Sequence, residues 1–216
     1  VRVKRAATLF AGFAEDDTGG EPIATERREL LFRYYGVSGI MIFDLSRYLE
    51  RRCVISIDLF PDIAPAELQA MVSQRCAELH WRPAETFFAG MLHDRVARAV
   101  LRAAGIGSHT PVDRLPQARL VALLKDFRLK VIGMGDASQA QVTRGGASVA
   151  EFDPTTMASR RVDGLFAAGE VLDVDGRSGG FNLHWAWASG IVAGEAAARL
   201  AVVRAEEHDI SSRGPE

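Results

Sequence analysis

The sequence predicts a mixed α/β fold (α+β overall), because alternating β-branched stretches and stretches with helical periodicity occupy different parts of the chain. Strand patterns come first, three helical patterns follow, and the chain ends with a strand, a glycine loop and a long helix. That last stretch, residues 165–194, is the most informative. The free amides and partial positive charge at a helix N-terminus suit a ligand rich in oxygen and negative charge.

Residues 1–62 are predicted to be mainly β-structure. Alternating or β-branched stretches predict strands at 1–13, 29–35 and 53–60. The acidic and glycine-rich run at 16–20 predicts a turn, and a tight connection is expected at 36–39. A helix should follow over residues 40–50, with Ser38 as its N-cap.

Residues 63–127 change to a helical period. Apolar residues recurring every three or four positions predict helices at 66–79, 86–104 and 115–127. Pro65 lies near the first helical position of the first of these, and Gly105 is the expected C-cap of the second. A strand is expected next, at 128–132.

Two further strands are predicted, over residues 140–143 and 165–168, each leading into glycines. The first ends in a turn at 144–146, which is either a plain connection or a place where an arginine meets a phosphate. The second is buried and is followed by Gly169 and Glu170, a glycine that permits close approach and a carboxylate that can accept hydrogen bonds from hydroxyl groups.

The glycine loop at 176–180 leads into the last helix, for which Asn182 is the expected N-cap. This spacing lets the end of the preceding strand and the start of the helix face one crevice, the usual ligand position in open α/β sheets. Gly190 and Gly194 are small residues expected to let this helix pack tightly on a sheet.

Composition argues against several classes of function. The net charge of −2 does not favour nucleic-acid binding. The two cysteines, Cys53 and Cys76, form no disulfide framework or zinc motif, so we expect small buried residues in a reducing cytoplasm. The five histidines form no metal-ligand pair, and the apolar run at 183–203 contains charged residues, which favours a soluble core helix over a membrane span.

Three segments carry a family resemblance: LLFRYYGVSG at 30–39, AQVTRGGASVAEFDPTTMAS at 140–159 and GLFAAGEVLDVDGRSGGFNLHWAWASGIVAG at 164–194. They resemble a bacterial family of FAD-dependent flavoproteins that includes aminoacetone oxidase and a flavoprotein reductase of bile-acid metabolism. In that family an inserted domain, part β-barrel and part helical, splits the FAD-binding domain.

The resemblance implies the domain organisation and the partner of this chain. Residues 1–138 would be the insertion domain, with its β part at 1–62 and its helical part at 63–127. Residues 139–216 would be the C-terminal half of the split FAD-binding Rossmann-like domain. The chain starts with Val inside a strand pattern and contains no GxGxxG motif, so we expect the N-terminal FAD half upstream of it.

The resemblance also implies a cofactor site for FAD. Glu170 would bind the ribityl chain beside Gly169, and the helix N-terminus would stabilise negative charge on the reduced ring. The remaining residues expected to bind the cofactor are Thr143, Gly145, Gly146, Gly179, Gly180, Phe181, Asn182 and Leu183. Two positions depart from the family pattern: Ile40 stands where proline is usual, and His184 stands where glutamine is expected.

The sequence leaves three functions open. One is the C-terminal portion of an FAD-dependent oxidoreductase that transfers hydride through flavin N5, with NAD(P)H as a candidate electron donor. The second is a noncatalytic fragment that binds no flavin without the N-terminal half, and the third is an unrelated nucleotide-binding module. For the first we expect a small-molecule substrate in the cytoplasm, with no metal, membrane or nucleic-acid partner, and we assign no acid or base.

Overall fold

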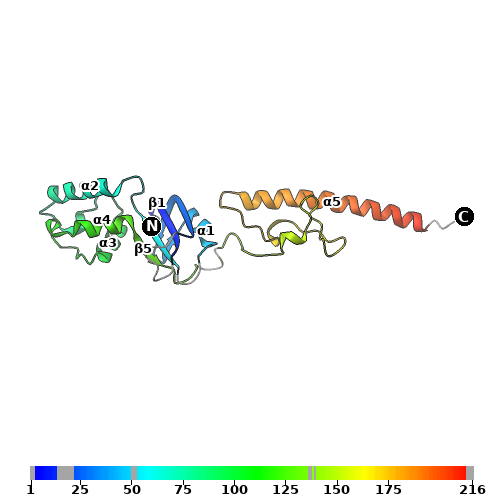
Figure 1. The fold of residues 1–216 in the computed structure, drawn as a ribbon, viewed down its shortest axis with the longest axis horizontal. Helices are drawn as coiled ribbons and strands as arrows, with labels where there is room; N and C mark the ends of the chain where they lie inside the picture. The colour runs from blue at the N-terminus through cyan, green and yellow to red at the C-terminus, as the bar shows by residue number, and fades with distance from the viewer. Residues whose placement is uncertain (1–2, 14–21, 50–52, 136–137, 139, 213–216) are drawn as a thin grey trace. The chain divides into compact units, whose positions relative to one another are not determined.

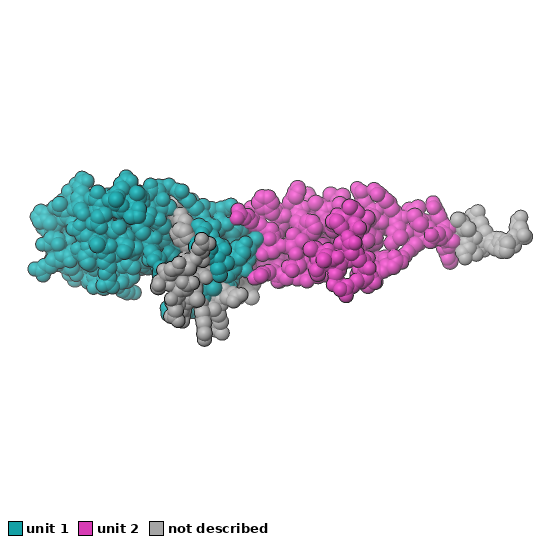
Figure 2. Space-filling view, viewed as in Figure 1, with its two compact units in different colours: residues 1–134 teal, residues 135–216 magenta. Residues whose placement is uncertain are grey.

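The computed structural model describes residues 3–13, 22–49, 53–135, 138 and 140–212. The chain divides into two compact units, Val1–Met134 and Gly135–Glu216, which are coloured separately in Figure 2. The turn predicted at 16–20 lies outside the described residues. Whether the first unit is an inserted domain, with the boundary predicted after residue 138, stays a prediction.

Unit 1 contains a five-stranded antiparallel sheet with the strand order β3-β2-β1-β4-β5. The strands are β1 (Val3–Phe13), β2 (Ala24–Arg33), β3 (Gly36–Ser38), β4 (Val54–Asp58) and β5 (Phe127–Lys130). The β5 strand follows the helices and returns to pair with β4. Among the described strands the sheet has β3 and β5 as its two edges. That this sheet is the β-barrel part implied by the resemblance stays a prediction.

The helices of unit 1 are α1 (Ile40–Ser46), α2 (Pro65–Glu78), α3 (Asp94–Ala103) and α4 (Gln117–Lys125). Pro65 is at the start of α2, as predicted, because its fixed φ angle suits the first helical turn. The N-cap predicted at Ser38 is wrong, since Ser38 belongs to β3 and Gly39, with φ of 105°, precedes α1 without a side-chain cap.

The helix predicted over 86–104 is wrong in its first half. Residues Ala84–Thr86 form a 3₁₀ turn, and α3 begins only at Asp94. His93 is the N-cap of α3, and its ring atom Nδ1 accepts a hydrogen bond from the Arg95 amide. Gly90 has φ of 78°, a left-handed conformation that interrupts a right-handed helix. At the other end the C-cap is Ala104, and the predicted cap Gly105 lies one position later, where its φ of 73° gives the left-handed conformation that commonly follows a helix.

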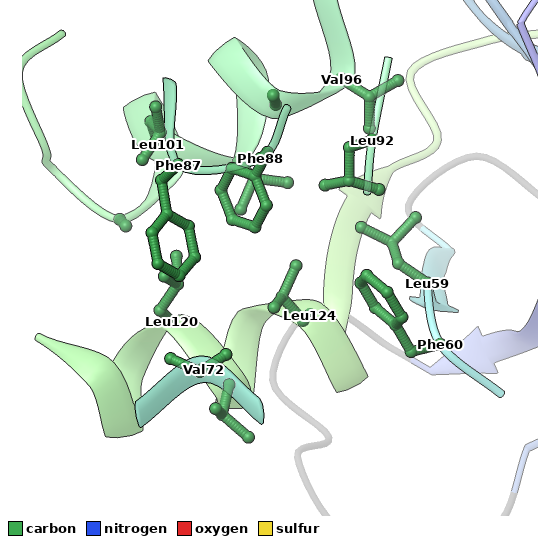
Figure 3. Packing of buried hydrophobic residues seen from close by; sticks show 14 of the residues in the cluster. Leu59, Phe60, Val72, Phe87, Phe88, Leu92, Val96, Leu101, Leu120 and Leu124 are labelled. Carbon is green, nitrogen blue, oxygen red and sulfur yellow. The ribbon is translucent and has the colours of Figure 1, made fainter. Parts of the chain in front are cut away.

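The sheet and the helices of unit 1 share one hydrophobic core. Phe87 and Phe88 pack edge to face with ring centroids 5.0 Å apart, and Leu120 and Leu124 of α4 lie close to them (Figure 3). A polar contact also ties α4 to the end of β4: Lys125 Nζ donates to the carbonyls of residues 60 and 63 at 3.0 and 2.9 Å and pairs with Asp58 at 2.5 Å. The β part and the helical part are therefore one packing unit.

Unit 2 consists of irregular backbone beside one long helix, α5 (Phe181–Ser212), shown in yellow to red in Figure 1. The strands predicted at 140–143 and 165–168 are wrong, because the described residues of this unit contain, apart from α5, only isolated bridges and short 3₁₀ turns. Residues 165–167 instead meet 157–159 through one isolated antiparallel bridge, Ala158 with Phe166, and through two hydrogen bonds of 2.8 and 3.2 Å. An apolar segment becomes a strand only when a neighbouring segment continues such a ladder along its edge.

The core of unit 2 is small. Its buried residues are Phe152, Met157, Leu172 and Ala193. Much of α5 is therefore exposed, and Phe181–His208 is long and apolar enough to cross a membrane, with 11% of the apolar window buried. One such helix is weak evidence for a membrane, because the core helix of a larger soluble domain has the same length and composition.

Candidate functional site

The structure brings two of the predicted site residues together, although they are 27 positions apart. The backbone amide of Thr143 donates a hydrogen bond of 2.6 Å to Glu170 Oε1, and both residues are exposed. One carboxylate oxygen of Glu170, Oε1, therefore already accepts a hydrogen bond from a backbone amide. The carboxylate stands at an open surface of unit 2, where it can accept further hydrogen bonds from a ligand.

Gly145 and Gly146 let the backbone after Thr143 run against the backbone after Glu170. Their φ angles are 99° and 142°, and a Cβ added at Gly146 would lie 2.6 Å from the carbonyl oxygen of Val171. The next residue, Ala147, forms a parallel bridge with Leu172: its amide donates to Val171 at 2.8 Å, and its carbonyl accepts from Asp173 at 2.9 Å. Only glycine permits this approach.

Gly169 is fixed to α5 by buried hydrogen bonds. It has φ of 70°, its amide donates to Ser189 Oγ at 2.9 Å, and its carbonyl accepts from Trp185 Nε1 at 3.2 Å. Ser189, 2% exposed, donates in turn to the Trp185 carbonyl at 2.6 Å. Sequence reasoning missed Ser189 and Trp185, although a serine on the buried face of an apolar helix signals a need for a polar partner.

The glycine loop is held by Asn182, but not as predicted. The N-cap assignment is wrong, because α5 begins at Phe181 and the Asn182 side chain turns back to the loop. Its Oδ1 accepts from the Gly176 amide at 2.7 Å, and its Nδ2 donates to the Gly176 carbonyl at 3.1 Å. Gly179 and Gly180, with φ of 128° and 94°, make the turn into the helix.

The start of α5 presents backbone donors. The first bond into the helix runs from the His184 amide to the Gly180 carbonyl at 2.9 Å, so the amides of Phe181, Asn182 and Leu183 precede the intrahelical ladder. Phe181 and Leu183 are 63% and 70% exposed, so they do not bury this end of the helix. The helix N-terminus therefore offers an electropositive surface to an electron-rich group.

Metal-binding clusters and cysteines are the other groups that could carry chemistry in this chain. Within the described ranges, no group of three His, Cys, Asp or Glu side chains could hold a metal ion. Cys76 is buried, as predicted, and burial raises the pKa of its thiol, which keeps it protonated and unreactive. Cys53 is only half-buried, so the prediction of burial is wrong for that residue.

Residues 36–196 match the sequence profile of the HI0933-like protein Rossmann domain. The chain belongs to this family. It is 29% identical over 189 residues to the 3-dehydro-bile acid delta(4,6)-reductase of Clostridium scindens, an alignment that covers 83% of this chain and 46% of that protein. The resemblance to a flavoprotein family with a bile-acid reductase among its members is confirmed, and the family is one of oxidoreductases.

Two further relatives are ribosomal RNA dihydrouridine synthases. The one from Escherichia coli is 31% identical over 165 residues, which cover 76% of this chain and 40% of that protein. The one from Haemophilus influenzae is 28% identical over 164 residues, with coverage of 74% and 40%. The chain therefore spans less than half the length of the curated relatives that it matches.

Proposed function

We propose that this chain is the C-terminal portion of an FAD-dependent oxidoreductase, with unit 2 contributing the contacts to the flavin and ribityl parts of the cofactor. The observation that carries the proposal is the Thr143–Glu170 contact, which places a carboxylate beside a glycine-lined backbone in a member of a Rossmann-type reductase family. The HI0933-like Rossmann domain and a reductase relative support FAD as the group to be bound.

The residues present fit that cofactor. Glu170 can accept a hydrogen bond from a ribityl hydroxyl while the Thr143 amide fixes its position. The amides of Phe181, Asn182 and Leu183 can donate toward the N1 and C2 carbonyl edge of an isoalloxazine. When bound, the flavin supplies hydride transfer through N5. The pyrophosphate needs a GxGxxG loop, which this chain lacks, so we expect the N-terminal half of the domain to supply it.

The names of the relatives suggest the class of bond that is reduced. A 3-dehydro delta(4,6) steroid and the uracil ring both contain a carbon–carbon double bond conjugated to a carbonyl group, and reduction adds two hydrogens across it. We propose such a conjugated double bond as the substrate of the whole protein. We propose a small molecule as the substrate and the cytoplasm as the location, and the two dihydrouridine synthases make an RNA base the second candidate.

Flavin content of the longer protein that contains this chain tests the proposal. Glu170→Ala should weaken FAD binding roughly ten- to a hundredfold, since it removes a charge-assisted hydrogen bond. Glu195→Gln is the matched control, because Glu195 is an exposed carboxylate on α5 that pairs with Arg199 at 3.3 Å. Unchanged FAD affinity in Glu170→Ala refutes the ribityl role.

The same measurement separates the enzyme from the noncatalytic alternative. The longer protein should show flavin absorbance as isolated or after addition of FAD, whereas this chain alone should remain colourless. A longer protein that takes up no FAD overturns the oxidoreductase proposal. Oxidation of the bound flavin by conjugated enones, and its reduction by NAD(P)H, would then identify the substrate class and the electron donor.

A further inference from the structure

The α3 helix presents a row of arginines to solvent. Arg95, Arg98 and Arg102 are exposed and follow one another at intervals of three and four residues, which places them on one side of the helix. At 1.5 Å of rise per residue, the row spans roughly 10 Å of helix. The opposite side of α3 packs into the core of unit 1 through Val96, Ala97, Val100 and Leu101. The core therefore keeps the arginine row on the outside of unit 1.

The arginines of this row have no acidic partner. In the part of the chain that the structure describes, no carboxylate forms an ion pair with Arg95, Arg98 or Arg102. Arg98 Nε donates to a backbone carbonyl of its own helix at 3.3 Å. Arg128, an exposed arginine of β5, differs in this respect, because it pairs with Asp126 at 2.8 Å. The three positive charges on α3 are therefore free to bind an external anion.

Helix stability does not explain the arginine row. Like charges three or four positions apart on a helix repel each other. Arg95 lies in the first turn of α3, where the helix dipole disfavours a cation, and of the three only Arg102, in the last turn, is placed favourably. Glutamine or alanine would suit the helix at least as well. The row therefore has a cost to the free helix, which the binding of an anionic ligand would offset.

The sequence around α3 is also positive. Residues 93–119 contain five arginines and two aspartates, whereas the whole chain has a net charge of −2. The two arginines that follow α3, Arg114 and Arg119, are exposed as well. The net charge of the chain, which disfavours a nucleic-acid partner, is thus an average over surfaces of different sign. A basic stripe along one helix is the electrostatic footprint of a nucleic-acid-binding surface.

Trp81 indicates which polyanion fits unit 1. Its side chain is 68% exposed, and the Arg82 guanidinium lies 4.6 Å from the centroid of its ring. Proteins that bind single-stranded RNA combine contacts to phosphates with exposed aromatic rings on which bases stack. An acidic peptide has no base to stack. A membrane-binding helix needs large apolar side chains beside its cations, whereas the exposed apolar residues of α3 are Ala99 and Ala103.

We propose that the outer face of α3, defined by Arg95, Arg98 and Arg102, binds the phosphate backbone of single-stranded RNA, and that Trp81 stacks on an unpaired base. Each guanidinium would donate to a phosphate through its planar fork of N–H groups. This inference goes beyond the proposed function, because it assigns a ligand to unit 1 and uses no residue of the candidate site. It holds whether the reduced double bond lies in a small molecule or in an RNA base.

The salt dependence of RNA binding tests the arginine row. Fluorescence anisotropy of a labelled, unstructured RNA strand with this chain should give a slope of log Kobs against log[KCl] of about −2, because each of three phosphate contacts contributes about −0.7. Arg98→Gln should make the slope shallower by about 0.7, since glutamine keeps the helix propensity and removes one contact. Circular dichroism should show the same helix content in both proteins.

Arg128→Gln is the matched control for Arg98→Gln. It removes the same charge from an exposed arginine of unit 1 that is already paired with Asp126, so the slope should stay at its wild-type value. An unchanged slope in Arg98→Gln overturns the proposal. An equal change in Arg128→Gln also overturns it, because it would show attraction to the overall charge of the chain rather than contacts from the arginine row.

Trp81 gives a second, independent measurement. Trp81→Ala should weaken RNA binding roughly five- to a hundredfold at every salt concentration and leave the slope unchanged, because base stacking releases no counterions. Trp81→Phe should keep most of the affinity, since phenylalanine also offers a ring. If Trp81→Ala binds RNA as tightly as the wild type, the stacking role is refuted.

Other anionic partners would give different results. Poly-glutamate that competes as well as unlabelled RNA would show an acidic protein partner, and binding to phosphatidylglycerol vesicles in preference to RNA would show a membrane surface. Either result overturns the proposal. Neither measurement involves the flavin, so failure of RNA binding refutes only this inference, and failure of the longer protein to take up FAD refutes only the proposed function.

Discussion

At the residue scale, Gly146 is a position of the candidate site where a side chain would clash with backbone. A methyl group there would lie 2.6 Å from the carbonyl oxygen of Val171, whereas one at Gly145 would meet nothing within 4 Å. We predict that Gly145→Ala costs about 1 kcal/mol from its positive φ alone. Gly146→Ala should cost about 3 kcal/mol, because strain and a backbone clash add. Chemical denaturation of both variants measures the difference, and equal losses would contradict it.

A second residue-scale prediction concerns Asp153, whose Oδ1 accepts from the Thr155 hydroxyl at 2.5 Å and amide at 2.8 Å. These bonds to the Thr155 hydroxyl and amide lower the pKa of Asp153 below its ordinary 3.8. The contribution to stability is therefore present above the unfolded pKa and lost as pH falls through the folded one. Asp153→Asn should have a lower Tm than the wild type at neutral pH, and the difference in Tm should disappear under acid conditions. A difference in Tm that does not depend on pH refutes this prediction.

At the element scale, the position of the Gly169–Glu170 turn depends on α5. Ser189 both accepts from the Gly169 amide and donates to the Trp185 carbonyl, so a single hydroxyl joins the turn to the helix. Sequence periodicity predicts elements whose bounds are set by their own residues, such as α2, whose start follows from Pro65. It fails for residues 165–168, because apolar content alone cannot supply the neighbouring strands that a sheet needs.

We predict that Ser189→Ala destabilises unit 2 by about 1–3 kcal/mol, because the buried amide of Gly169 loses its acceptor. FAD affinity of the longer protein should fall with it, since Glu170 follows Gly169 directly. Amide hydrogen exchange at Gly169, together with thermal unfolding, measures the effect. Ser148→Ala, at an exposed position without a side-chain cap bond, is the control. Unchanged protection of the Gly169 amide would show that the hydroxyl is not its anchor.

At the scale of the whole molecule, the two units differ in how complete they are. Unit 1 has a sheet and helices around one shared core, whereas unit 2 buries a small cluster and leaves most of α5 exposed. We therefore expect residues 1–134 to unfold cooperatively when produced alone. Leu120→Ala, at a fully buried position, should cost this unit about 2–5 kcal/mol.

Peptide-resolved hydrogen exchange on the intact chain tests the independence of the units. Leu120→Ala should raise exchange across unit 1 and leave α5 unchanged, because α5 belongs to a separate compact unit. Arg119→Ala, exposed on the same helix, should change stability by less than about 0.5 kcal/mol. Equal loosening of α5 by Leu120→Ala would show that the units share their stability.

The sequence by itself determined the family, the mixed α/β class, the helices that carry their own start and stop signals, and the glycines and acid of the candidate site. Those features are local, because they depend on φ preferences, spacing and side-chain type. Only the tertiary structure decided that Thr143 holds Glu170, that Ser189 anchors Gly169 and that Asn182 holds the glycine loop. These contacts join residues whose pairing depends on how the backbone folds around them, which no single-sequence pattern encodes.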